Sequence, residues 1–226
     1  MKPMGLRCAV FDLDMTLIDS SIPLMTGANL LALEFGLETV TREEVLTAEK
    51  SAPSATFESF WRALWGRYDP AWSRVYQDRL ADREYEVMAL YPGARKTLET
   101  LKARGIALGV ASNRDWPGRA LAALGLTPLF RAVVGQYDVA RPKPAPDMLC
   151  RALELLGAGP EEAVYIGDSL GDIACAAAAG VKSFAVTTGG HDRAELAAQG
   201  AWRVGESLDG LLEVFGCQDE PYGSGD

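Results

Sequence analysis

The sequence has 226 residues and a mass of 24.3 kDa, enough for one large domain or for a domain that carries a smaller insertion. Hydrophobic residues make up 48% and charged residues 23%, which excludes intrinsic disorder for the bulk of the chain. The 31 acidic and 22 basic residues give a formal net charge of −9, which repels nucleic acid and anionic membranes. We therefore expect no nucleic acid and no membrane among the partners.

The apolar runs and the cysteines argue against further classes of protein. No apolar stretch approaches the roughly 20 residues that a membrane-spanning helix needs. The four cysteines are scattered without a CxxC pair, and the chain has a single histidine, His191. This pattern argues against a disulfide framework and against a zinc site. We expect a reduced, cytoplasmic protein.

The first part of the chain combines one strand with a helical segment. Residues 6–13 are apolar and β-prone and end in aspartates, which predicts a short buried strand. Residues 19–90 then show helical patterns only. Thr41 and Glu44 have the form of a capping box, and apolar side chains recur on one helix face over 57–68. We therefore predict an all-helical domain inserted after the first strand, at residues 19–90.

From residue 91 onward strands and helices alternate. We expect strands at 106–111, 132–134, 163–166 and 182–186, and helices at 94–103, around 119–124 and at 145–156. Strands separated by helices favour right-handed crossovers and a parallel sheet. The predicted fold class is α/β, a Rossmann-like doubly wound parallel sheet formed by residues 1–18 and 91–216. Residues 217–226 are polar and Gly-rich, and we expect a disordered tail there.

Polar side chains follow four of these strands. They are Asp12, Asp14 and Thr16 after the first, Ser112 and Asn113 after the second, Lys143 in the loop after the third, and Asp168 and Asp172 after the fourth. Parallel sheets bind ligands at the carboxyl ends of their strands. We therefore expect these carboxylates, the hydroxyl, the amide and the ammonium group to surround one point.

Such a set suits phosphoryl transfer with a divalent cation. Clustered carboxylates repel one another and a phosphate group unless a cation neutralises them, and Mg²⁺ prefers hard oxygen ligands. One aspartate can attack phosphorus to form an aspartyl-phosphate, and a second can protonate the leaving oxygen. Lys143 and Ser112 would stabilise the charge on the equatorial phosphate oxygens.

The same residues, in this order and spacing, resemble the four motifs of the haloacid dehalogenase-like hydrolase superfamily. The resemblance covers residues 7–189, and the helical insert is placed like the C1 cap of that superfamily. The stretch 11–20 is most similar to the phosphoglycolate phosphatase-like branch. The resemblance implies a Mg²⁺-dependent phosphatase acting on a small phosphorylated metabolite, phosphoglycolate-like or a sugar phosphate. Phosphoglucomutase-type phosphoryl transfer and a nucleotidase remain alternatives, and monomer or homodimer is undecided.

The resemblance also implies a role for each matching residue. Asp12 would be the nucleophile and Asp14 the general acid/base, and Asp14 would also give a backbone carbonyl to the metal. Ser112 and Asn113 would bind the substrate phosphate together with Lys143, which would also pair with the nucleophile. The implied metal site consists of Asp12, Asp14, Asp168 and Asp172. Because dehalogenases of this superfamily lack an acid at the position of Asp14, phosphoester cleavage is favoured over carbon–halogen cleavage.

Two further positions carry expectations. Lys50 and Ser51 lie between two predicted cap helices, where caps of this superfamily hold residues that select the substrate. Met15 stands where the superfamily usually has glycine, in the turn after the first strand. A methionine with positive φ there would carry strain of about 1 kcal/mol, and its effect on the pocket is open.

Two interpretations from other classes account for fewer residues. The stretch 167–171 matches G-x-S-x-G, which would make Ser169 the nucleophile of a serine esterase with His191 as base. That interpretation leaves Asp12 and Lys143 without a role. A non-enzymatic phospho-accepting module also combines acidic residues, a hydroxyl and a lysine, but such modules are shorter and lack a long helical insert.

Overall fold

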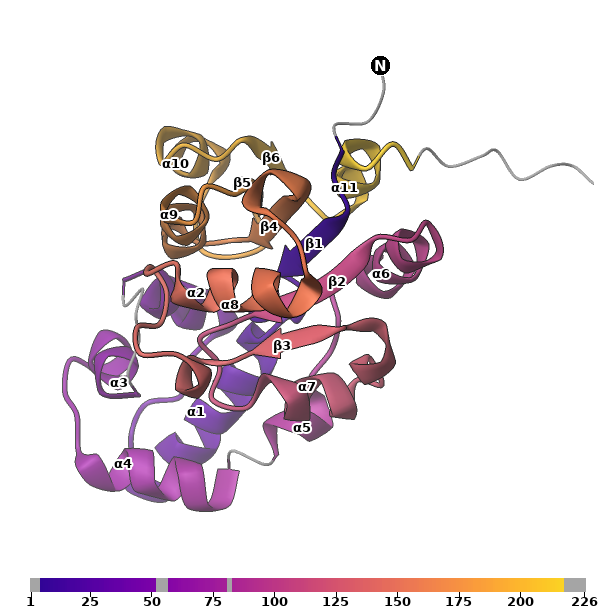
Figure 1. Cartoon of the computed structure of the whole chain (residues 1–226). Helices are drawn as coiled ribbons and strands as arrows, with labels where there is room; N and C mark the ends of the chain where they lie inside the picture. The colour runs from indigo at the N-terminus through magenta and orange to yellow at the C-terminus, as the bar shows by residue number, and fades with distance from the viewer. Residues whose placement is uncertain (1–4, 52–56, 81–82, 218–226) are drawn as a thin grey trace, which may run out of the picture.

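The computed structural model describes residues 5–51, 57–80 and 83–217. These residues form a six-stranded parallel sheet with the order β3-β2-β1-β4-β5-β6 (Figure 1). The strands are β1 (Cys8–Phe11), β2 (Ala107–Ala111), β3 (Ala132–Val134), β4 (Ala163–Gly167), β5 (Lys182–Val186) and β6 (Arg203–Gly205). Every residue of β1 is buried, because β1 lies between β2 and β4 with helices over both faces. The predicted α/β class and Rossmann-like parallel sheet are confirmed.

Two strands differ from the prediction by more than one residue. The first strand covers Cys8–Phe11 rather than 6–13, because the chain turns away from the sheet at the aspartates. The edge strand β6 was not predicted from the sequence. It has three residues, its first, Arg203, is exposed, and none of the three is fully buried, so it lacks the apolar pattern of a buried strand.

Helices cover both faces of the sheet. On one face lie α6 (Ala94–Ala103), α7 (Pro117–Ala123) and α11 (Asp209–Val214), and on the other α8 (Asp147–Leu156), α9 (Leu170–Ala178) and α10 (Arg193–Ala198). Short 3₁₀ helices at Thr127–Leu129, Gln136–Asp138 and Pro160–Glu162 connect them. Alternate residues of the central strand point into different cores: Phe11 packs with α6 and α7, and Val10 packs with α8.

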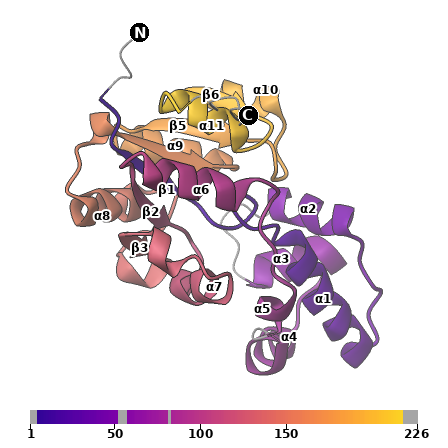
Figure 2. The ribbon, with the colours of Figure 1, turned by 90° about the vertical axis from the view of Figure 1, so that its right-hand side faces the viewer.

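Between Ser21 and Val87 the regular elements of the described residues are all helices, and these lie apart from the sheet (Figure 2). They are α1 (Ser21–Phe35), α2 (Arg42–Ser51), α3 (Phe57–Trp65), α4 (Pro70–Val75), the π-helix Tyr76–Leu80 and α5 (Glu84–Val87). We call this group the cap. The predicted capping box is present at the start of α2: the Thr41 amide donates to Glu44 Oε2 at 2.7 Å, and the Glu44 amide donates to Thr41 Oγ1 at 3.3 Å.

The two segments that join cap and core lie side by side. Ile18 forms an antiparallel bridge with Leu90, the Asp19 amide donates to the Ala89 carbonyl at 3.0 Å, and the Tyr91 amide donates to the Leu17 carbonyl at 3.0 Å. The positions predicted as domain boundaries lie beside this bridge, and the division into domains stays a prediction.

At the other end of the chain, Cys217 was predicted to begin a disordered tail. It is instead 4% exposed and packs in the core with α11, and residues 218–226 lie outside the described residues. Among the described helices, none has the length and apolar character needed to cross a membrane.

Candidate active site

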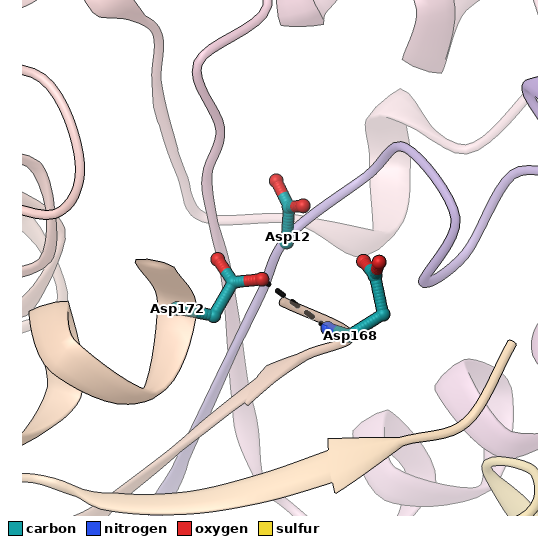
Figure 3. A group of neighbouring side chains, drawn as sticks. All are labelled: Asp12, Asp168 and Asp172. Carbon is teal, nitrogen blue, oxygen red and sulfur yellow. Dashed lines mark hydrogen bonds between the residues drawn. The ribbon is translucent and has the colours of Figure 1, made fainter. Parts of the chain in front are cut away.

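Three carboxylates meet at the carboxyl edge of the sheet (Figure 3). Asp12 follows β1, Asp168 follows the neighbouring strand β4, and Asp172 lies in the first turn of α9. Because β1 and β4 are parallel and paired from Cys8↔Ala163 onward, their ends coincide. Each of the three side chains offers an oxygen, all within 4.8 Å of one another, and all three residues are buried.

Local hydrogen bonds orient Asp172. Its Oδ2 accepts from the backbone amides of Asp168 at 3.2 Å and Ser169 at 3.0 Å, and from the Ser169 hydroxyl at 2.6 Å. Ser169 in turn accepts from the Asp172 amide at 3.1 Å and is thus the N-cap of α9. A Cβ on Gly167 would lie 2.4 Å from the Asp172 carboxyl carbon, so only glycine leaves room for this carboxylate.

These contacts weaken the serine esterase interpretation. The Ser169 hydroxyl donates to Asp172, and the Nδ1 atom of His191, the base which that interpretation requires, lies 3.6 Å from Glu195. The hydroxyl thus has a structural function at the start of a helix.

Lys143 lies between two of the carboxylates. Its Nζ is 2.8 Å from Asp12 Oδ1 and 2.7 Å from Asp172 Oδ1, and the residue is 7% exposed. Asn113 fixes the lysine backbone: its Oδ1 accepts from the Lys143 amide at 3.0 Å and its Nδ2 donates to the Lys143 carbonyl at 3.3 Å. The Asn113 amide group therefore positions Lys143, and its contact with phosphate stays a prediction. Ser112, the other predicted phosphate ligand, is buried beside them at the end of β2.

The cluster contains more carboxylates than ammonium groups. Burial and these charges shift the pKa values of the carboxylates. Burial raises the pKa of Asp12 to about 6, against the opposing effect of Lys143. Burial, together with the charges of Asp172 and Asp12, raises the pKa of Asp168 well above its usual range. For Asp172 burial acts in the same direction, but the ion pair with Lys143 leaves its pKa below the ordinary value.

This excess of buried negative charge fits a divalent cation. Asp12 and Asp168 have the more weakly neutralised carboxylates, and oxygen ligands of this kind suit Mg²⁺. The carboxylate of Asp172 is already occupied by hydrogen bonds and by Lys143. The structure thus groups three of the four predicted metal ligands, and the side chain of the fourth, Asp14, is engaged elsewhere.

Asp14 is held by Arg114. The guanidinium donates from Nε to Asp14 Oδ2 at 3.1 Å and from Nη2 to Oδ1 at 2.7 Å, and the Ser20 hydroxyl also donates to Oδ1. Burial alone would raise the pKa of Asp14, but Arg114 leaves it below its usual value. Sequence reasoning missed Arg114, although it directly follows Ser112 and Asn113 in the same strand-end loop.

The cap residues proposed to select the substrate lie at the boundary with the core. Lys50 Nζ is 2.8 Å from a carboxylate oxygen of Glu195 in α10, and the Ser51 hydroxyl donates to the Thr47 carbonyl at 2.8 Å. Their substrate contacts stay predictions. The neighbouring Glu49 interacts with the site: burial and the charge of Asp14 raise its pKa to about 7.

Met15 adopts the positive φ that its position implied. Its φ is +57° and it is 4% exposed. The Thr188 hydroxyl donates to the Met15 carbonyl, and the Tyr91 hydroxyl lies 3.7 Å from the Met15 sulfur as donor. These contacts hold the methionine in a backbone conformation that otherwise favours glycine, at a cost of about 1–2 kcal/mol.

Comparison with known proteins agrees with this geometry. Residues 9–186 match the haloacid dehalogenase-like hydrolase family. The chain belongs to this family. The phosphoglycolate phosphatase of Escherichia coli (strain K12) is 33% identical over 210 residues, which cover 81% of this chain and 82% of that protein.

Solved structures show the same architecture. CbbY from Rhodobacter sphaeroides, in complex with phosphate, matches with a TM-score of 0.76 at 25% identity, over 93% of this chain and 99% of that one. A haloacid dehalogenase-like family hydrolase from Streptococcus pneumoniae shares the fold, with a TM-score of 0.78 at 21% identity over 93% and 99%. The resemblance seen in the motifs is confirmed, and the chain is a phosphatase, a phosphoric monoester hydrolase of this family.

Proposed function

We propose that the protein hydrolyses a small phosphorylated metabolite, phosphoglycolate-like or a sugar phosphate, in a Mg²⁺-dependent reaction with an aspartyl-phosphate at Asp12. The observation that carries this proposal is the setting of Asp12. Its buried carboxylate ends the central strand, lies 2.8 Å from Lys143, and has the oxygens of Asp168 and Asp172 within 4.8 Å.

In this mechanism Asp12 attacks phosphorus, and the bond from phosphorus to the leaving oxygen breaks. Arg114 and Ser20 hold Asp14 as a carboxylate in this structure, so Asp14 takes up a proton from solvent before this step. It gives that proton to the leaving oxygen, and the product alcohol leaves. Asp14, now a carboxylate, accepts a proton from water as the water oxygen attacks the aspartyl-phosphate, which releases phosphate and restores Asp12. The positive charge of Lys143 and a hydrogen bond from the Ser112 hydroxyl stabilise the negative charge on the phosphate oxygens during both steps.

Asp12 and Asp168 would hold Mg²⁺, with the Asp14 backbone carbonyl as a further oxygen and Asp172 orienting Lys143 beside them. When bound, the cation supplies the positive charge that the carboxylates and the phosphate lack together. The phosphoglycolate phosphatase activity of the relative in Escherichia coli and the phosphate bound by CbbY support a small phosphate ester as substrate.

The test is phosphate release from a panel of phosphorylated metabolites, with Mg²⁺ or with a chelator. Asp12→Asn removes the nucleophile with little change in shape, so we expect a loss of turnover of at least about a thousandfold with the fold retained by circular dichroism. Asp147→Asn, at an aspartate that pairs with Arg141 on the surface, is the matched control and is prepared in parallel. It should keep its activity, whereas a contaminating phosphatase would leave equal activity in both preparations. Substantial activity of Asp12→Asn, or release that continues in chelator, would contradict the proposal.

A further inference from the structure

Two aromatic side chains lie exposed beside each other on the core, outside the candidate active site. Trp116, directly before α7, is 60% exposed, and Tyr137, in the 3₁₀ helix after β3, is 66% exposed. Their ring centroids are 5.8 Å apart, and the ring planes are inclined at 50°. Because large aromatic rings gain much from burial, an adjacent exposed pair is typical of a binding surface.

The two rings border a pocket of about 370 Å³. Its walls also include Pro117, Arg119 and Val133, and among the residues that the structure describes none of the predicted catalytic or metal-binding side chains lines it. This volume is at the lower end of the range found for small-molecule sites. The pocket therefore suits a compact ligand.

The loops that carry the two rings are held in place. A Cβ on Gly135 would lie 2.8 Å from the Cδ atom of Pro117, so the loop after β2 and the loop after β3 pack closely. The Gln136 side-chain amide donates to Asp115 Oδ1, and the Gly135 amide donates to Asp138 Oδ2 at 2.7 Å. The pocket is thus preformed, which lowers the entropy that a ligand loses on binding.

The charges around the pocket favour a cation. Asp115 and Asp138 line it, and among the described residues one oxygen of each carboxylate accepts no hydrogen bond. The guanidinium of Arg119, the basic residue of the lining, lies over the Tyr85 ring of the cap, 4.9 Å from its centroid. The faces of aromatic rings are themselves negative, so rings and carboxylates attract the same kind of group.

The spacing of the rings restricts the shape of that cation. A flat aromatic ligand held between two rings needs their centroids about 7 Å apart, twice the usual contact distance of about 3.5 Å. The centroids of Trp116 and Tyr137 are closer than this, at 5.8 Å. An ammonium or guanidinium group is small enough to lie over the outer ring faces and to reach the free carboxylate oxygens.

We propose that this pocket binds a small organic cation, whose ammonium or guanidinium group lies over Trp116 and Tyr137 and pairs with Asp115 and Asp138. The inference goes beyond the proposed function and does not depend on it, because none of these four residues takes part in the transfer of phosphate. It is a second site on the core, with its own ligand.

The test compares butylguanidinium with butylurea, a neutral molecule of nearly the same shape. Titrations are followed by NMR through the tryptophan indole N–H signals, and the signal of Trp116 is identified by its loss in Trp116→Phe. We expect butylguanidinium to shift this signal with a Kd of about 1 mM, and butylurea to bind at least about tenfold more weakly. Trp202 is the internal control, because Lys182 and Arg203 already lie 5.0 Å from the centroid of its ring.

Two variants test the parts of the pocket separately. Asp138→Asn removes one charge and keeps an acceptor for the Gly135 amide, and Tyr137→Ala removes one ring face. We expect each to raise the Kd of butylguanidinium about two- to fivefold. Asp147→Asn is the matched control, since that surface carboxylate already pairs with Arg141, and its Kd should equal that of wild type.

Equal binding of butylguanidinium and butylurea would overturn the inference, since the pocket would then recognise the alkyl chain alone. A signal of Trp116 that moves no more than that of Trp202 would place the cation elsewhere or show that none binds. An unchanged Kd in both Asp138→Asn and Tyr137→Ala would also contradict the proposed contacts.

Discussion

Around Asp12 the core buries four charged side chains, whereas the cap buries aromatic rings. The core site holds Asp12, Lys143, Asp168 and Asp172, each at most 7% exposed. In the cap, Trp61 stacks on Trp65 with ring centroids 5.4 Å apart, and Trp72 meets Trp65 edge-on at 5.3 Å. Buried charges remain stable only with matched partners, while the burial of aromatic rings depends mainly on how the rings pack.

The comparison shows that the core site and the cap are stabilised in different ways. The core keeps reactive groups close at an electrostatic cost, so its stability depends on the partner of each charge. The cap is held by packing, and its charged side chains at the boundary, such as Glu84 and Lys50, reach across to core residues. We therefore expect the core site to respond to changes of charge and the cap to changes of volume.

The largest effect is expected at Lys143. Lys143→Met leaves Asp12 and Asp172 buried without their ammonium partner, and we expect a loss of about 3–5 kcal/mol in the free energy of unfolding, with activity lost as well. Urea unfolding in chelator measures it. The same substitution at Lys50, whose partner Glu195 is exposed, should change stability far less. Equal losses of stability from Lys143→Met and Lys50→Met would show that the cost of losing the lysine does not depend on burial.

A change of volume in the cap should have an intermediate effect. Gly27→Ala places a methyl group 2.5 Å from the Tyr76 ring, which Trp61 prevents from moving away, so we expect a loss of about 1–3 kcal/mol. Thermal unfolding would detect it. Gly118→Ala in α7 is the control, because its methyl group meets no atom within 4 Å. That variant should be neutral or slightly more stable, since alanine favours a helix.

The smallest expected change in stability depends on pH and concerns Glu49, at the boundary between cap and core. Burial and the charge of Asp14 raise the pKa of Glu49 from 4.5 to about 7. The folded protein thus holds this proton more tightly than the unfolded chain does. Its stabilising contribution is complete below the unfolded pKa and is lost as pH rises through the folded value. Glu49→Gln carries no such charge, so it should become more stable than wild type above about pH 7, by about 1–2 kcal/mol.

Urea unfolding of wild type and Glu49→Gln across this pH range measures the difference in stability. Glu43→Gln, at an exposed position of the same helix, is the control for the loss of one negative charge from α2. A constant difference between Glu49→Gln and wild type from acid to neutral pH would show that the fold does not raise the pKa of Glu49.

Much of the core site could be predicted from the sequence because several of its residues lie directly after a strand end. Asp12, Ser112 and Asp168 directly follow β1, β2 and β4, and a parallel sheet brings such positions together whatever the rest of the chain does. The spacing of the motifs along the chain was therefore enough.

The contacts between cap and core could not be predicted in this way. Arg114 meets Asp14 and Glu84 across 100 and 30 residues of sequence, and only the docking of the cap on the core makes them neighbours. Lys50 was expected between two helices but lies in the last turn of α2, and its orientation toward Glu195 also follows from that docking. No local pattern records an arrangement of this kind.

The bridge between Ile18 and Leu90 allows the cap to be replaced by a segment of another length. The two joining segments are hydrogen-bonded to each other, so the chain leaves the core and returns to it at neighbouring positions, as it does at a tight loop. The entropy of closing a loop grows only slowly with its length, so segments of quite different size can occupy this place at similar cost. A longer, shorter or different segment can therefore take the place of the cap without disturbing the strand that ends before Asp12.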